Sequence, residues 1–234
     1  MHLISIDDLS VPEIENLFHL ADGFLEVSTR AIKKVPTLRG RTIINLFLEP
    51  STRTQSSFEL AGKRLSADVI NIKGSSSSVV KGESLKDTIL TLESYRPDVI
   101  VMRHPQVGAA RLATLYTKAS VINAGDGTGE HPTQCLLDLY SLRRVYGDLQ
   151  GLKVAIVGDV LRSRVARSNI FGFRKMGLEV RLVGPSTLMP PGIEEWGVPV
   201  YDDLDALTDV DVIYLLRMQL ERAKGKVPPV PSLR

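Results

Sequence analysis

The segment TIINLFLEPSTRT, at positions 42–54, decides the fold and marks the first functional region of the chain. Residues 42–48 are mostly apolar, which is typical of a strand inside a parallel sheet. A polar loop begins at Glu49, and a helical pattern follows through Phe58, Ala61 and Leu65. A strand that leads through a short loop into a helix is the opening half of a βαβ unit.

Strand and helix patterns alternate along the rest of the chain. Ser10-Val11-Pro12-Glu13 predicts a capping box at the start of the first helix. Strands are expected at 42–48, 67–72, 98–102, 120–123, 153–157, 179–183, 198–201 and 211–216. Further helices are expected at 58–65, 84–95, 107–116, from Pro132 onward and at 163–176. The pattern predicts an α/β fold of two domains, each a mostly parallel sheet flanked by helices on both faces.

The boundary between these domains is expected in the loop after Tyr146, giving domains at 1–147 and 148–234. The polar, serine-rich stretch from Gly74 to Ser78 predicts a mobile loop. The proline-rich end from Lys224 to Arg234 shows no core pattern, so we expect the second domain to be incomplete at its C-terminus.

Composition excludes several classes of protein. Of 234 residues, 43% are hydrophobic and 24% are charged, so a packed core is expected. A net charge of +2 gives no long-range reason to expect nucleic acid or a membrane surface as a partner. The single cysteine, Cys135, excludes an internal disulfide and a multi-cysteine zinc site. The first residues lack the pattern of a signal peptide, and we expect a cytoplasmic location.

The loop after the first strand predicts an anion site. Ser51, Thr52 and Thr54 supply hydroxyl groups, and Arg53 supplies a planar cation, where a helix begins. Backbone N–H groups and the helix dipole converge there as well. The alternative is an ordinary helix cap beside a solvated arginine. Four such residues in a row favour the anion site.

Two further segments follow strands of the first domain. Arg103 comes directly after the strand that ends at Met102, and strand ends are where open α/β sheets bind ligands. The glycines of residues 125–129 allow a close backbone approach to a ligand. His131 lies at the start of a helix, where a neutral imidazole is favoured and suits polarising a carbonyl group. The residues alone leave open whether His131 has this role or a structural one.

The second domain repeats the arrangement with arginines. Arg164 follows the strand that ends at Val157, and Arg217 and Gln219 follow the strand that ends at Leu216. Taken together they suggest a site for carboxylates, although each alone is more often a surface residue. No Ser-His-Asp pattern, metal cluster, Walker loop or dinucleotide fingerprint occurs. The set predicts an enzyme that holds two anions side by side and acts by positioning and electrostatic stabilisation.

Several motifs occur together in this chain, namely Ser51-Thr52-Arg53-Thr54, Ser57-Phe58-Glu59, Lys81-Gly82-Glu83, Arg103 and His131-Pro132-Thr133-Gln134. In combination they resemble those of the transcarbamylases, and the resemblance extends over essentially the whole chain. The pattern is most similar to catalytic chains that carbamoylate aspartate. The resemblance implies that Ser51, Thr52, Arg53 and Thr54 hold the phosphate of carbamoyl phosphate. It implies that Thr54, Arg103 and His131 stabilise the oxyanion and that Gln134 holds the carbamoyl NH₂ group.

For the second substrate, the resemblance implies that Arg164, Arg217, Gln219 and Lys81 bind L-aspartate. Ser77 and Lys81 would reach the site of a neighbouring subunit, which implies a homotrimer with shared sites. No metal and no organic cofactor are expected, and a regulatory chain is a possible partner. From the residues alone, Lys81 is an ordinary solvated loop lysine.

Two rival functions compete with this one. Ornithine carbamoyltransferase would want an acidic or polar pocket and a cysteine in place of Thr133, whereas Arg164, Arg217 and Gln219 suit a second carboxylate. A truncated relative that binds carbamoyl phosphate without turnover is the other alternative. Gln55 departs from the family pattern, because many relatives carry a basic residue there.

Overall fold

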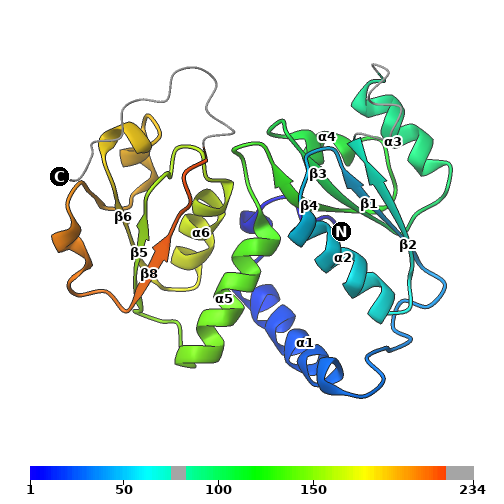
Figure 1. The fold of residues 1–234 in the computed structure, drawn as a ribbon, viewed down its shortest axis with the longest axis horizontal. Coiled ribbons are helices and arrows are strands. Elements are labelled where there is room, and N and C mark those ends of the chain that lie inside the picture. The colour runs from blue at the N-terminus through cyan, green and yellow to red at the C-terminus, as the bar shows by residue number, and fades with distance from the viewer. Residues whose placement is uncertain (75–82, 220–234) are drawn as a thin grey trace. The chain divides into compact units, whose positions relative to one another are not determined.

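The computed structural model describes residues 1–74 and 83–219 (Figure 1). The first part of the chain contains η1 (Ile6–Asp8), α1 (Val11–Thr29), β1 (Thr42–Phe47), α2 (Thr52–Arg64), β2 (Asp68–Lys73), α3 (Leu85–Glu93), β3 (Val99–His104), α4 (Ala109–Ala113) and β4 (Ser120–Asp126). The second part contains α5 (Pro132–Tyr146), β5 (Lys153–Val157), α6 (Arg164–Lys175), β6 (Glu179–Val183), η4 (Ser186–Leu188), η5 (Ile193–Trp196), β7 (Val200–Tyr201), η6 (Leu204–Leu207) and β8 (Val212–Leu215). The alternation expected from the sequence is confirmed, with element ends shifted by a few residues.

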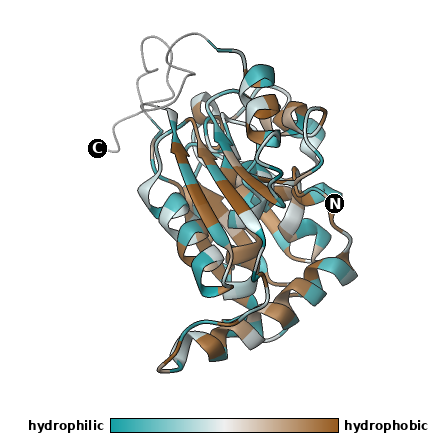
Figure 2. Cartoon of the chain, turned by 90° about the vertical axis from the view of Figure 1, so that its right-hand side faces the viewer, coloured by the Kyte–Doolittle hydropathy of each residue, from teal (hydrophilic) through white to brown (hydrophobic). Residues whose placement is uncertain are grey.

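The first unit is built on a parallel sheet with the strand order β2-β1-β3-β4. Alternation along β1 sends Ile43 and Phe47 to one face, where they pack with Phe58 of α2. Ile44 and Leu46 point to the other face, where the core includes residues of α3 and α4. β1 is therefore mostly apolar on both faces, and Figure 2 shows much of this sheet in brown.

The N-terminal segment is part of this first unit. Leu3 pairs with Ile122 of β4, and its N–H donates to the carbonyl of Val121 at 2.9 Å. Ser10 and Glu13 form the predicted capping box at the start of α1. The predicted apolar face of α1 is buried only in part, since Ile14 and Phe18 are buried whereas Phe24 is 41% exposed.

The second unit contains a parallel sheet with the strand order β7-β6-β5-β8. Ile170 and Phe173 of α6 are fully buried, as is Ile156 of β5. The ring of Phe173 meets that of Tyr214 edge-on, with centroids 6.4 Å apart, so Tyr214 of β8 faces α6. The predicted α/β architecture of parallel sheets flanked by helices is confirmed.

The two compact units divide between Thr133 and Gln134, one helix earlier than the boundary expected after residue 147. The difference concerns α5, whose Asp138 accepts hydrogen bonds from α6 and β8. Residues 1–147 and 148–234 as functional domains stay a prediction. Within the described ranges, none of the helices is both long and apolar enough to cross a membrane.

Candidate active site

Both candidate site regions lie where the order of strands reverses. In the first sheet β1 leads to β2 on one side, whereas β3 leads to β4 on the other, so the reversal lies between β1 and β3. The segment from Glu49 to Thr54 follows β1, and Arg103 lies near the end of β3. Ligands of open α/β sheets bind outside the carboxyl ends of the strands at such a reversal. The first predicted site therefore has the topology of a binding crevice.

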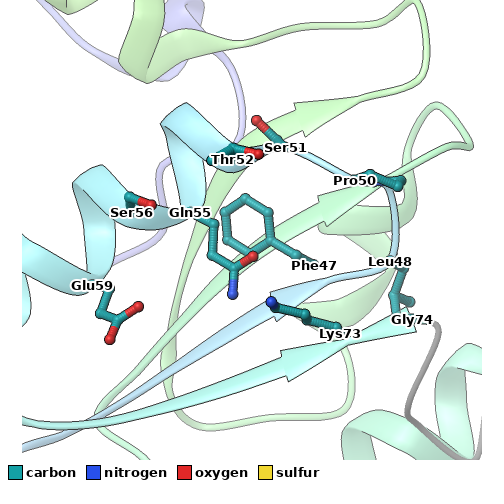
Figure 3. Close-up of a pocket in the computed structure, with 10 residues that line it drawn as sticks. All are labelled: Phe47, Leu48, Pro50, Ser51, Thr52, Gln55, Ser56, Glu59, Lys73 and Gly74. Carbon is teal, nitrogen blue, oxygen red and sulfur yellow. The ribbon is translucent and has the colours of Figure 1, made fainter.

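The N-terminus of α2 forms one wall of a pocket of about 310 Å³ (Figure 3). Ser51 is the N-cap residue, yet its side chain makes no capping hydrogen bond, and both Ser51 and Thr52 line the pocket. Gln55 and Lys73 point toward one another within it. The pocket thus brings two of the predicted phosphate-binding residues together with a lysine of β2, which sequence reasoning missed.

Arg53, Thr54 and Arg103 lie outside this pocket lining. Arg53 and Thr54 belong to the first turn of α2, where Arg53 is exposed and Thr54 half-buried. Arg103 is 9% exposed, and its Nη2 donates to Glu49 Oε1 at 2.8 Å. The N–H of Leu48 also donates to the carbonyl of Arg103 at 2.8 Å. Arg103 is therefore fixed beside the β1 loop, and Glu49, missed by the sequence analysis, is its anionic partner.

A carboxylate network shapes the loop that leads to His131. Asp126 is buried and accepts hydrogen bonds from the N–H of Gly108 at 2.7 Å and of Glu130 at 2.8 Å. The Glu130 carboxylate in turn accepts from Ser5 Oγ at 2.5 Å and from the N–H of Ile6 at 3.0 Å. The N-terminal segment thus holds the loop in place. Sequence reasoning missed this network because its partners are far apart in the chain.

His131 itself is buried, with 6% of its surface exposed, at the start of α5. Its Nδ1 lies 3.2 Å from Thr133 Oγ1. This contact restrains the orientation of the ring. The expected role of His131 as a neutral imidazole that polarises a carbonyl group stays a prediction.

Two glycines of this loop, Gly127 and Gly129, are closely surrounded by other atoms of the protein. A Cβ on Gly127 would lie 2.7 Å from the carbonyl oxygen of Pro105, and a Cβ on Gly129 would lie 2.7 Å from Asp126 Oδ1. Gly127 also has a φ of +48°, which favours glycine. The absence of a side chain thus makes room for the Pro105 carbonyl at Gly127 and for Asp126 of the same loop at Gly129, while the expected approach to a ligand stays a prediction.

We expect Gly127→Ala to lower the free energy of unfolding by about 2 kcal/mol or more, through the positive φ and the steric overlap together. Gly108→Ala is the matched control, because Gly108 has a φ of +82° but no atom within 4 Å of the place where the added methyl group would lie. The control should cost only about 1 kcal/mol. Urea unfolding measures both values, and equal losses would show that the overlap at Gly127 is relieved.

The second candidate region lies at the reversal of the second sheet, between β5 and β8. Asp159, in the loop after β5, is fully buried, and its carboxylate accepts from Arg162 Nη1 at 3.2 Å and from the N–H of Gln219 at 3.1 Å. Arg217 Nη2 donates to Gln219 Oε1 at 3.2 Å. The loops after β5 and β8 are thereby joined, with Arg217 and Gln219 in contact.

Arg164 is the first residue of α6 and is only 2% exposed. A buried guanidinium is costly unless anions or hydrogen-bond acceptors surround it. The structure thus places Arg164 on the β5 side of the reversal and the Arg217–Gln219 pair on the β8 side. Asp159 and Arg162 were missed as site residues, although both lie in the loop that the sequence analysis singled out.

Gln134 lies in the first turn of α5, and its Nε2 donates to Asp138 Oδ1 at 2.9 Å. Ser77 and Lys81, together with most of the serine-rich stretch, lie outside the described residues. Among the residues that the structure describes, no group of three or more His, Cys, Asp or Glu side chains is placed to hold a metal ion.

Comparisons with known proteins identify the family of the chain. Residues 1–144 match the family described as aspartate/ornithine carbamoyltransferase, carbamoyl-P binding domain. The whole chain is 53% identical to the aspartate carbamoyltransferase catalytic subunit of Desulfotalea psychrophila, of which it covers 73%. The chain therefore spans about three quarters of the length of that relative.

Two solved structures extend the comparison. The catalytic subunit of M. jannaschii aspartate transcarbamoylase is 42% identical, with a TM-score of 0.83 over 94% of this chain and 75% of that one. Aspartate transcarbamoylase from Trypanosoma cruzi, in complex with carbamoyl phosphate and aspartate, is 34% identical, with a TM-score of 0.84 over 94% of this chain and 73% of that one. Sequence and fold agree over nearly the whole chain, which belongs to the aspartate carbamoyltransferase catalytic-subunit family.

Proposed function

We propose that the chain transfers the carbamoyl group of carbamoyl phosphate to the amino group of L-aspartate, giving N-carbamoyl-L-aspartate and phosphate. The observation that carries the proposal is the placement of cationic and hydroxyl side chains at the strand reversal of each sheet. The T. cruzi relative, whose structure holds carbamoyl phosphate and aspartate, supports the choice of substrates. Such a reaction is an early step of de novo pyrimidine biosynthesis.

In the first unit, Ser51, Thr52, Arg53 and Thr54 bind the phosphate group at the N-terminus of α2. The hydroxyl of Ser51 makes no capping bond and is available to the ligand, and the helix dipole favours the anion. Thr54, Arg103 and His131 donate hydrogen bonds to the carbonyl oxygen of carbamoyl phosphate. Because charge grows on that oxygen as the amine attacks, donors fixed in place stabilise the transition state more than the ground state.

The contact between Arg103 and Glu49 gives the first site a defined resting state. The pair is mostly shielded from solvent, with 11% of the Arg103 side chain and 21% of the Glu49 side chain exposed. The carboxylate keeps the guanidinium charge balanced while no anion is bound. A bound phosphate offers the same planar cation a further acceptor.

In the second unit, Arg164, Arg217 and Gln219 bind the two carboxylates of L-aspartate, with Lys81 as a further cation. The burial of Arg164 and the contact of Arg217 with Gln219 support this assignment. Asp159 holds the Gln219 backbone and so keeps the segment after β8 in place. A cationic side chain such as that of ornithine would meet arginines here, and the carboxylate of Asp159 is already bonded to Arg162 and to the Gln219 backbone, which disfavours the ornithine alternative.

The reaction needs no redox change. The aspartate nitrogen forms a bond to the carbonyl carbon, and the tetrahedral intermediate collapses as the bond from carbon to the phosphate oxygen breaks. The departing phosphate accepts the proton lost by the amine. The protein contributes alignment of the two substrates and a set of fixed donors around the oxyanion.

The assembly belongs to the same proposal. We place Ser77 and Lys81 in the site of a neighbouring subunit, so that the working unit is a homotrimer with shared sites. A regulatory chain is a further possible partner, in line with the word "subunit" in the names of the relatives. The cytoplasm is the proposed location.

A colorimetric assay for carbamoyl amino acids tests the proposal. The purified chain is given carbamoyl phosphate with L-aspartate and, separately, with L-ornithine. We expect product with aspartate alone, and product with ornithine alone would overturn the substrate assignment. Phosphate binding without product from either amine would favour the alternative of a carbamoyl-phosphate-binding relative without turnover.

A further inference from the structure

A partly buried carboxylate in the second unit holds one of the proposed substrate-binding residues. Asp138 lies one turn after Gln134 on α5, and its Oδ1 accepts from Gln134 Nε2 at 2.9 Å. Its Oδ2 accepts from Asn169 Nδ2 of α6 at 2.9 Å and from Tyr214 Oη of β8 at 2.8 Å. One carboxylate therefore receives three donors from three different elements.

The three donors around Asp138 suit its ionised form, because a carboxylate accepts hydrogen bonds and donates none. Burial holds the pKa of Asp138 above its usual value, although the hydrogen bonds from Asn169, Tyr214 and Gln134 lower it in part. The pKa of Tyr214 is raised by burial and by the Asp138 charge. The tyrosine hydroxyl therefore stays protonated and donates a hydrogen bond to Asp138. The cluster is thus a fixed acceptor with three fixed donors.

The hydrogen bond to the Asp138 carboxylate determines the orientation of the Gln134 side-chain amide. An amide has an NH₂ end that donates and an oxygen end that accepts. Since Asp138 accepts only, it binds the NH₂ end, and Oε1 of Gln134 is left facing away from the carboxylate. No other hydrogen bond of the Gln134 side chain is found within the described part of the chain. Gln134 therefore presents an acceptor to a ligand.

We propose that Asp138 is a positioning residue that fixes the Gln134 amide with its oxygen outward, so that the site selects a carbamoyl NH₂ group over an acyl methyl group. The inference rests on the proposed function and on the role that the family resemblance implies for Gln134, which is to hold the carbamoyl NH₂ group. An NH₂ group donates to the outward oxygen, whereas a methyl group makes no such bond and leaves that acceptor without a partner. Asp138 touches no substrate and acts through Gln134.

Asp138→Asn reverses this orientation without changing the shape of the side chain. The side-chain oxygen of the new asparagine has to face Asn169 and Tyr214, because both of these residues donate hydrogen bonds at that position. The NH₂ of the new amide then faces Gln134, whose own NH₂ has to turn away. The rotated Gln134 presents a donor to the carbamoyl NH₂, and two donors repel.

Two stable phosphonates test the proposal. Phosphonoacetamide carries an amide NH₂ where 2-oxopropylphosphonate carries a methyl group. We expect the unaltered protein to bind the amide about tenfold more tightly than the ketone, as measured by titration calorimetry. We expect Asp138→Asn to abolish that preference while the affinity for inorganic phosphate stays unchanged.

Tyr214→Phe is the matched control. It removes a hydrogen bond to the same carboxylate, but from Oδ2, and leaves the contact with Gln134 in place. We expect it to keep the tenfold preference. In a Gln134→Ala background the preference is already lost, and Asp138→Asn should have no additional effect, because the two residues act as one unit.

Several outcomes would overturn the proposal. A preference that survives in Asp138→Asn contradicts it while leaving the proposed function intact. An equal loss in Tyr214→Phe shows that the carboxylate is structural only. If the unaltered protein binds phosphate but has no preference, the proposed role of Gln134 fails, and this inference fails with it.

A second measurement covers the case in which Asp138→Asn does not fold. NMR hydrogen exchange of the side-chain amide in the unaltered protein reads the same orientation. We expect the Gln134 NH₂ protons to exchange much more slowly than those of exposed Gln106, because they donate to a partly buried carboxylate. Equally fast exchange would overturn the proposal.

Discussion

We expect replacement of Arg103 by alanine to lower kcat for carbamoyl transfer by about a hundred- to a thousandfold, the usual effect of removing one oxyanion donor. Arg103 is buried beside the loop that follows β1, where its position is fixed by Glu49 and by the carbonyl of Ala124. The effect should fall mainly on kcat, because the charge that Arg103 stabilises develops in the transition state. Steady-state kinetics with carbamoyl phosphate and L-aspartate measures it.

The control separates catalysis from folding. Arg103→Ala leaves the Glu49 carboxylate without its cation in a mostly shielded place, which should cost about 3 kcal/mol of stability. The double variant Arg103→Ala/Glu49→Gln removes that unpaired charge, so we expect it to recover most of the stability and none of the activity. Turnover that returns together with stability would contradict the catalytic role of Arg103.

The second large effect is the recovery of activity from two inactive chains. Lys81→Ala and His131→Ala should each be inactive alone, because each removes a proposed site residue. In a mixture that forms mixed trimers, some sites take His131 from one chain and Lys81 from its neighbour. For random assembly of equal amounts, about a quarter of the sites contain both residues, so we expect about a quarter of the unaltered activity.

Mixed trimers have to be verified before the assay, for example by a charged tag on one chain and ion-exchange separation of the species. Mixing Lys81→Ala with Arg103→Ala provides a second pair that should also recover activity. His131→Ala mixed with Arg103→Ala should not recover, since both residues belong to the first unit of one chain. A lack of recovery in separated mixed trimers would show that the sites are not shared.

Local sequence patterns predicted most of the fold. The apolar run of β1 and the cap at Ser10 each depend on neighbouring residues, and both predictions are confirmed. The division between the compact units was harder to predict from the sequence, because it depends on the elements against which α5 packs. Asp138 of that helix bonds to Asn169 and Tyr214, which are 31 and 76 residues away in the chain.

In the candidate site, too, contacts between residues far apart in the chain could not be predicted from the sequence. Ser51, Arg103 and His131 could be singled out because each lies near or just after the end of a strand, and the parallel sheet brings strand ends to one edge. The anionic partners were missed, since nothing near Glu49 or Asp126 in the sequence shows what those carboxylates bind. Lys73, at the end of β2, reaches the pocket because β2 pairs with β1 in register.

The sequence by itself determined the parallel α/β architecture, the family, and the residue types that follow each strand, because these depend on local periodicity and on motifs of a few residues. The tertiary structure decided which cation has which counter-ion and which amide is held in which orientation. Glu49 with Arg103, Glu130 with the N-terminal segment, and Asp138 with Asn169 and Tyr214 are set by hydrogen-bond geometry between residues that no local pattern pairs. Burial makes each of these contacts obligatory, since a polar group withdrawn from water has to find its partner inside the protein.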